Sequence, residues 1–130
     1  MSGDPRIDPG AAADQIGEVI RFDIVDHAAG ARVMHVVGEV DTLTAPVLRT
    51  RVDEQLAEVS LLVLDLSSVT FLGSAGLAVL VAAKAEAERQ QNCFRLVLGS
   101  RIVTRALEAT GLVGLFDIAD GVPQALAAAR

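Results

Sequence analysis

The sequence predicts a single α/β domain with a mixed β-sheet of four to five strands and about four helices. Three observations support this fold class: an alternating segment near residue 20, an apolar run over 60–66, and helical patterns on both sides of that run. The nearly continuous apolar run predicts a strand that is covered on both faces. A length of 130 residues fits one domain, and 52% apolar residues supply enough material for its core.

The first elements are predicted from hydrophobic periodicity. Apolar and polar residues alternate over 19–25, which is the period of a half-buried strand. A turn through 27–30 and a second strand over 32–37 follow, and so short a connection indicates an antiparallel hairpin. Thr44 is the expected N-cap of the first helix, with Pro46 in its first turn. The inward residues of that helix are Leu48, Val52, Leu56 and Val59, and its outer ion pair is Arg49 with Asp53.

The second half of the chain continues the alternation of strands and helices. A loop over 67–73 is expected to lead from the central strand to a helix over about 74–90, and 94–98 reads as the next strand. Such a strand–helix–strand unit should be parallel and right-handed. Ser100 is the expected cap of a third helix, which Gly111 ends in a left-handed turn. The inward residues of this third helix are Val103, Ala106, Leu107 and Thr110. An edge strand is expected over 116–118. The last helix is expected to be capped by Asp120, and its inward residues are Val122, Ala125, Leu126 and Ala129.

Composition and charge argue against several classes of partner. Eleven basic and seventeen acidic residues give a net charge of −6, which repels nucleic acid and anionic membrane surfaces. The only aromatic residues are four Phe, so stacking of bases on aromatic side chains is not expected. No apolar stretch approaches the roughly 20 residues that span a bilayer.

The N-terminal segment and the single cysteine indicate the cytoplasm. Residues 1–18 carry four acidic residues and one Arg without the apolar region of a signal peptide, so we expect a flexible acidic arm. The lone Cys93 closes no internal disulfide and gives no sign of an oxidising compartment. We expect Cys93 to be packed in its strand, with redox control as the alternative.

The residues that could support catalysis are few. The two histidines, His27 and His35, stand in a predicted turn and a predicted strand, and we expect His35 to have no catalytic partner. No His, Cys and Asp cluster has the spacing of a metal site. Ser74 follows a strand, but Leu72 stands where a nucleophile elbow requires Gly. No phosphate-binding loop occurs, and Lys84 is the only lysine. We therefore expect no enzyme, no cofactor and no metal.

The segment from Asp65 to Leu77 has two interpretations. The structural one makes Ser74 an ordinary N-cap, whose loss costs about 1 kcal/mol. The functional one rests on Ala75 and Gly76, which leave the first helical turn nearly bare and the Ser74 hydroxyl accessible. Glycine is also a poor helix former, so Gly76 indicates that something approaches the helix closely.

Two motifs give this sequence a resemblance to a known family. Residues 38–46, GEVDTLTAP, are similar to the family pattern G-E-[LV]-D-x-x-T-A-P, and residues 65–77, DLSSVTFLGSAGL, are similar to D-L-S-x-V-x-F-[ML]-D-S-[SAT]-G-L. In their order and separation, the motifs resemble the STAS domain of stand-alone bacterial anti-sigma factor antagonists. The resemblance extends from residue 19 to the C-terminus, so residues 19–130 are expected to form the STAS domain.

The resemblance implies a switch in partner-switching regulation. In the family, the unphosphorylated antagonist binds an anti-sigma factor, a serine kinase of the histidine-kinase-like ATPase type, and thereby frees the sigma factor. Carried over, the phosphorylation site is Ser74, and a serine phosphatase is a further expected partner. The expected partner-binding residues are Asp41, Thr42, Gly73, Ser74, Ala75, Gly76 and Leu77. The family's acid before the serine is replaced here by Gly73, and the alternative function is a constitutive interaction module of a stress-signalling complex.

Overall fold

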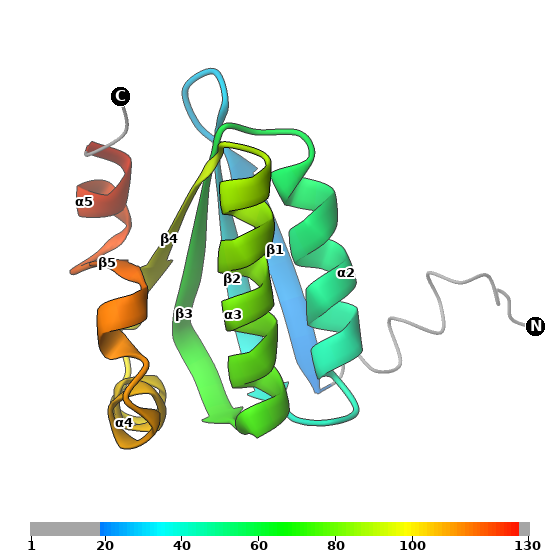
Figure 1. Ribbon diagram of the computed structural model, residues 1–130, viewed down its shortest axis with the longest axis vertical. Coiled ribbons are helices and arrows are strands. Elements are labelled where there is room, and N and C mark those ends of the chain that lie inside the picture. Colours follow the sequence, from blue (N-terminus) through cyan, green and yellow to red (C-terminus); the bar gives the residue numbers. More distant parts are fainter. Residues whose placement is uncertain (1–18, 128–130) are drawn as a thin grey trace, which may run out of the picture.

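The computed structural model describes residues 19–127 (Figure 1), so the expected acidic arm over 1–18 and the inward position of Ala129 lie outside the described residues. The elements are β1 (Ile20–Asp26), β2 (Ala31–Val40), α2 (Ala45–Leu56), β3 (Leu61–Leu72), α3 (Ser74–Arg89), β4 (Cys93–Val97), α4 (Arg101–Thr110), the 3-10 turn η1 (Val113–Leu115), β5 (Asp117–Ala119) and α5 (Val122–Ala127). The predicted α/β class is confirmed.

The five strands form one mixed sheet in the order β1-β2-β3-β4-β5. β1 is antiparallel to β2, while β2, β3, β4 and β5 are mutually parallel neighbours. The predicted hairpin and the predicted parallel unit β3-α3-β4 are therefore both confirmed.

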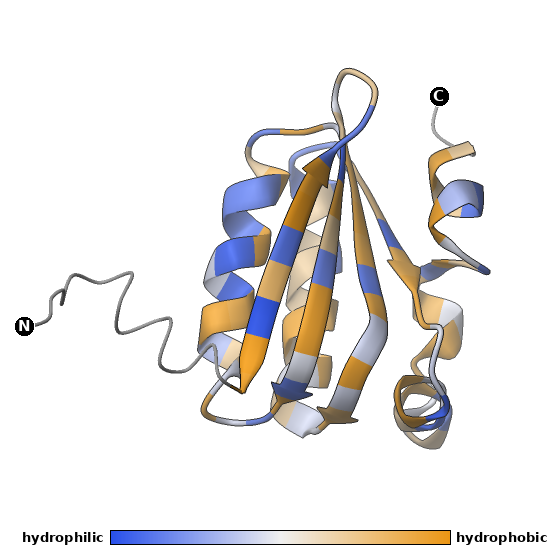
Figure 2. Ribbon diagram, turned by 180° about the vertical axis from the view of Figure 1, so that it is seen from behind, coloured by the Kyte–Doolittle hydropathy of each residue, from blue (hydrophilic) through white to orange (hydrophobic). Residues whose placement is uncertain are grey.

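The helices cover the two faces of the sheet unequally. α2 and α3 lie side by side over one face (Figure 1), and they enclose a core that includes the fully buried Leu48, Val52, Leu64 and Leu80. On the other face, α5 packs on β3, β4 and β5 over a smaller cluster around Val63. Seen from that side, β1 and β2 carry no helix within residues 19–127 (Figure 2).

The main correction concerns β3. The predicted loop over 67–73 is wrong, because the strand continues as far as Leu72. The β2–β3 ladder shifts register between His35 and Val37 and again between Gly38 and Glu39, and these irregularities break the two-residue alternation that marks a strand in a sequence. The extension brings the strand to within two residues of Ser74.

The predicted cap residues stand at the ends of α4 and at the start of α2, but they act differently. The Ser100 hydroxyl accepts a hydrogen bond from the Val103 N–H at 3.2 Å, and Gly111 has the left-handed φ of 72°. Thr44 stands at the N-cap position of α2 with Pro46 in the first turn, as predicted, but its side chain makes no capping bond. Its hydroxyl instead donates to the Glu39 carbonyl at 2.8 Å.

Two surface predictions have different outcomes. The ion pair between Arg49 and Asp53 on the outer face of α2 is confirmed at 2.9 Å. The expectation that Cys93 is packed is wrong, because its side chain is exposed at the first residue of β4. A residue that begins a strand next to a turn has fewer neighbours than one at its centre.

Candidate functional site

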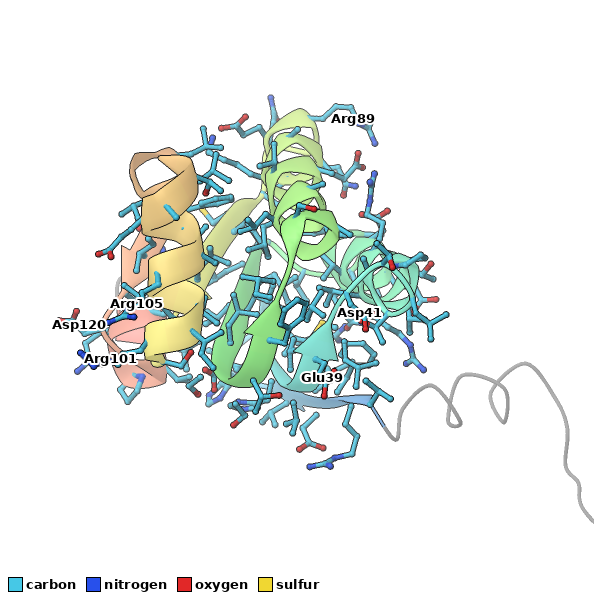
Figure 3. All side chains as sticks on the ribbon, turned by 90° about the horizontal axis from the view of Figure 1, so that it is seen from below. Glu39, Asp41, Arg89, Arg101, Arg105 and Asp120 are labelled. Carbon is cyan, nitrogen blue, oxygen red and sulfur yellow. The ribbon has the colours of Figure 1, made fainter. Side chains whose placement is uncertain are left out.

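The candidate site lies where β2 and β3 end side by side. Val40 and Leu72 are partners in the parallel ladder, and the Gly73 N–H donates to the Val40 carbonyl at 3.0 Å. The turn that leads into α2 and the residue that begins α3 are therefore held next to each other. Figure 3 views this end of the molecule, with Glu39 and Asp41 labelled near the strand ends.

Asp41 organises the turn before α2. Its carboxylate accepts hydrogen bonds from the N–H groups of Leu43 at 3.0 Å and Thr44 at 2.9 Å, as in an Asx-turn. The backbone N–H of Thr44, with smaller contributions from the Thr44 hydroxyl and the Leu43 N–H, keeps the pKa of Asp41 below its ordinary value. The turn therefore carries a negative charge at neutral pH and presents Thr42 to solvent.

Ser74 is the first residue of α3, and its side chain is exposed. Gly73 occupies the N-cap position, so the structural interpretation of Ser74 as a capping residue is wrong. Within residues 19–127 the Ser74 hydroxyl makes no hydrogen bond. It is therefore an accessible hydroxyl at the amino end of a 16-residue helix.

Gly76 and Leu77 belong to the first turn of α3, which begins at Ser74. Both are buried, and a Cβ at Gly76 would lie 2.6 Å from side-chain atoms of Val40 and of Leu72. The close approach inferred from this glycine is real, and what approaches is the end of the sheet. Because Gly76 has no side chain, the first turn of α3 packs directly against the ends of β2 and β3. Ser74 therefore lies at the edge of this contact.

Two exposed apolar side chains flank the site, and neither was predicted from the sequence. Leu43 in the Asp41 turn is 64% exposed, and Phe71 at the end of β3 is 48% exposed. Atoms of the Phe71 ring would lie 3.1 and 3.3 Å from a Cβ at Gly73, so the ring packs beside this glycine. The available signal was Phe71 itself, one of four aromatic residues in the chain, placed three residues before Ser74.

A second polar group lies within the sheet, away from Ser74. The Nδ1 atom of His35 is 2.7 Å from a carboxylate oxygen of Asp65, a contact that the sequence did not predict. The other oxygen of Asp65 accepts from the Ser67 hydroxyl at 2.7 Å and from the Ser67 N–H at 3.0 Å. Burial acts to raise the pKa of Asp65, but the bonds from Ser67 and His35 outweigh it and hold that pKa below its ordinary value.

Asp65→Asn is expected to lower the free energy of unfolding at pH 7 by about 1–2 kcal/mol, because the amide replaces a charged acceptor of three hydrogen bonds. A carboxyl with a depressed folded-state pKa stabilises the fold above its unfolded pKa and loses this contribution as pH falls through the folded value. The difference between wild type and variant should therefore shrink below about pH 4. Urea denaturation at pH 7 and pH 3 measures it.

Asp120→Asn is the matched control, because Asp120 is exposed. It should change stability by less than about 0.5 kcal/mol at both pH values. A loss from Asp65→Asn that stays constant with pH would contradict the assigned role of the carboxylate.

Residues 19–127 show neither a metal-binding cluster nor a membrane-spanning helix. They contain no group of three or more His, Cys, Asp or Glu side chains placed to hold a metal ion. The helices in this part of the chain are too short or too polar to cross a bilayer.

Fold and site together define a small α/β domain that presents a helix-initiating serine at the end of its sheet. A family model described as the STAS domain matches residues 24–125, and the chain belongs to the STAS domain family. The resemblance inferred from the two motifs is thereby confirmed.

Several proteins similar to this chain are named as antagonists of anti-sigma factors. The chain is 35% identical over 112 residues to the anti-sigma-F factor antagonist RsfB of Mycobacterium tuberculosis, an alignment that covers 85% of this chain and 90% of the relative. It is 35% identical over 85 residues to the anti-sigma-B factor antagonist of Listeria monocytogenes, covering 64% and 74%. A crystal structure of an anti-sigma factor antagonist from Mycobacterium paratuberculosis superimposes with a TM-score of 0.75 at 35% identity, covering 84% and 92%.

Proposed function

We propose that this chain is an anti-sigma factor antagonist, which binds an anti-sigma factor and so releases a sigma factor, and that phosphorylation of Ser74 ends the binding. The names of its relatives support the general role. The observation that carries the proposal for this chain is the exposed Ser74 hydroxyl, free of hydrogen bonds within the described residues, at the first position of α3.

The position of Ser74 favours a switch that acts on binding and leaves the fold intact. A phosphoryl group there would meet the unpaired N–H groups and the positive dipole end of α3, an interaction of about 0.3–1 kcal/mol. No side-chain contact of the fold is lost, because the hydroxyl has no partner within residues 19–127. The phosphorylated domain should therefore stay folded, and its effect should fall on the interface with the partner.

The surroundings of Ser74 fit a protein partner. Leu43 in the Asp41 turn and Phe71 at the end of β3 offer exposed apolar area beside the serine, and such anchors contribute much of the affinity of protein interfaces. Glu39 and Asp41 add negative charge near the strand ends (Figure 3), which complements a partner with basic residues. We therefore expect the anti-sigma factor, a serine kinase of the histidine-kinase-like ATPase type, to cover the Asp41 turn and the end of β3.

Phosphorylation and capture test the proposal together. Purified anti-sigma factors of the kinase type, from the organism that carries this chain, are incubated with the full chain and ATP. We expect one of them to add a single phosphoryl group to wild type, seen as about +80 Da in intact mass, and none to Ser74→Ala. The same kinase should be retained by immobilised Ser74→Ala and lost by the phosphorylated chain.

The alternative is a constitutive interaction module of a stress-signalling complex that is not phosphorylated, and Gly73 favours it. The family pattern has an acidic residue at this position, which here holds a glycine beside the Phe71 ring. Capture of an anti-sigma factor without any mass increase, or with a phosphoryl group on Ser67, Ser68 or Thr70, would support this alternative. Failure to retain any anti-sigma factor would contradict the function as an antagonist.

A further inference from the structure

We propose that two copies of this chain associate through β1, whose outer edge pairs antiparallel with the same strand of a second copy. The proposal does not depend on the function of Ser74. It joins two five-stranded sheets into one continuous sheet about a two-fold axis, an isologous contact of the kind that makes closed dimers.

β1 is the open edge of the sheet (Figure 2). It is seven residues long and keeps one register along its whole pairing with β2, without a bulge. The opposite edge, β5, is only three residues long. Within residues 19–127, no other strand pairs with the outer side of β1. A long, regular edge strand offers a row of N–H and C=O groups to another strand, whereas a short one does not.

The hydrogen bonds to β2 identify which groups of β1 point outward. The Glu39 N–H donates to the Val19 carbonyl at 2.9 Å, so Val19 directs its backbone groups toward β2. The direction alternates along an antiparallel strand, and the constant register carries this alternation through β1. The backbone groups of Ile20, Phe22 and Ile24 therefore face the free edge.

One register makes this edge complementary to its own copy. With Phe22 on the two-fold axis, opposite Phe22 of the second copy, the outward-facing residues pair with one another as hydrogen bonding requires. Its cross-strand pairs are Phe22 with Phe22, Arg21 with Asp23, Ile20 with Ile24, and Val19 with Val25. Aromatic, oppositely charged and apolar residues thus each meet a favourable partner, and every pair except the central one occurs twice.

Other registers that bring the same outward-facing backbone groups together have less favourable cross-strand pairs. Moving the axis to Ile24 places Phe22 opposite Asp26 and leaves Arg21 without an acidic partner. The registers centred on Arg21 or Asp23 place two like charges opposite each other, which destabilises a strand pair. Register is therefore specified by the charge pattern.

Three exposed apolar side chains gain cover in the proposed dimer. Val19 is 37% exposed, Ile24 39% and Val25 43%, and all three enter apolar cross-strand pairs. On the helix side, α2 packs mainly on α3, β2 and β3, and so does not block the outer edge of β1. Arg51 of α2 lies over the Phe22 ring at 5.7 Å, which supports the aromatic residue at the proposed axis.

Charge reversal tests the pairing. In sedimentation experiments on the full chain, wild type should shift with rising concentration from 13.6 kDa toward twice that mass. Arg21→Asp alone or Asp23→Arg alone should weaken self-association by roughly tenfold or more, because each places two like-charge contacts in the interface. The double variant should recover it, and an equimolar mixture of the two single variants should form a heterodimer.

Disulfide trapping tests the register in a Cys93→Ser background. Phe22→Cys should cross-link to its own copy under mild oxidation, since the Cα atoms of such a pair lie about 5.5 Å apart. Ile24→Cys, the control, should not, because its copy lies four residues along the strand. Cross-linking at Ile24→Cys with none at Phe22→Cys would overturn the register. A chain that stays monomeric into the hundreds of micromolar, or reversals that leave self-association unchanged, would overturn the proposal.

Discussion

Phosphorylation of Ser74 is expected to weaken binding of the anti-sigma factor about a thousandfold. An interface that covers the amino end of α3 would bury the phosphoryl dianion, and an uncompensated buried charge costs several kcal/mol. A cost of about 4 kcal/mol corresponds to this factor. Ser74→Glu, which adds one negative charge, should weaken binding by at least about tenfold, and Ser74→Ala should bind as wild type does. Isothermal titration calorimetry measures all four forms.

Ser68→Glu provides the matched control. It adds the same charge to another exposed residue, in β3 and not at a helix terminus. Its affinity should stay within about threefold of wild type, as expected for a charge outside the buried interface. Equal affinities for wild type, phosphorylated chain and Ser74→Glu would contradict a switch at Ser74.

Gly38→Ala is expected to destabilise the fold by more than about 4 kcal/mol, enough to abolish folding of many domains. Gly38 has a φ of +119°, a conformation that residues with a Cβ rarely adopt. A Cβ there would also lie 1.9 Å from the carbonyl oxygen of Val19. The alanine would therefore break the antiparallel pairing where β1 begins. Urea denaturation, or circular dichroism if no folded protein forms, measures the effect.

Gly111→Ala separates backbone strain from the steric clash. Gly111 also has a positive φ, 72°, but nothing lies within 4 Å of a Cβ placed there. Its substitution should cost only about 1–2 kcal/mol. If Gly38→Ala costs no more than Gly111→Ala, then Val19 does not lie against Gly38 as described.

Local signals sufficed for much of the fold. Ser100 and Gly111 were predicted as the two ends of α4 because capping residues act within one turn of the helix. The hairpin and the parallel β3-α3-β4 unit were predicted because hydrophobic periodicity and connection length depend only on neighbouring residues. These features need no knowledge of which distant segments meet.

Features that depend on distant contacts were missed. β3 continues through Ser67 and Ser68 because the ten-residue β2 pairs with it, and the register shifts opposite His35 and Gly38 hide the strand period. The contact of His35 with Asp65 joins residues 30 apart and depends on that register. For the candidate site, the motif located Ser74, but only the packing showed that Gly76 is required by the sheet end and that Phe71 is exposed.

The hydrogen bond from the Gly73 N–H to the Val40 carbonyl has a consequence for substrate recognition. It continues the β2–β3 ladder to the residue before Ser74, and α3 begins immediately afterwards. The backbone on both sides of the serine is therefore already committed to regular structure, and it cannot straighten into a kinase groove as a flexible peptide does. A kinase that modifies Ser74 has to recognise the folded junction between β3 and α3. Its specificity would therefore depend on the tertiary structure of this domain more than on the sequence near the serine.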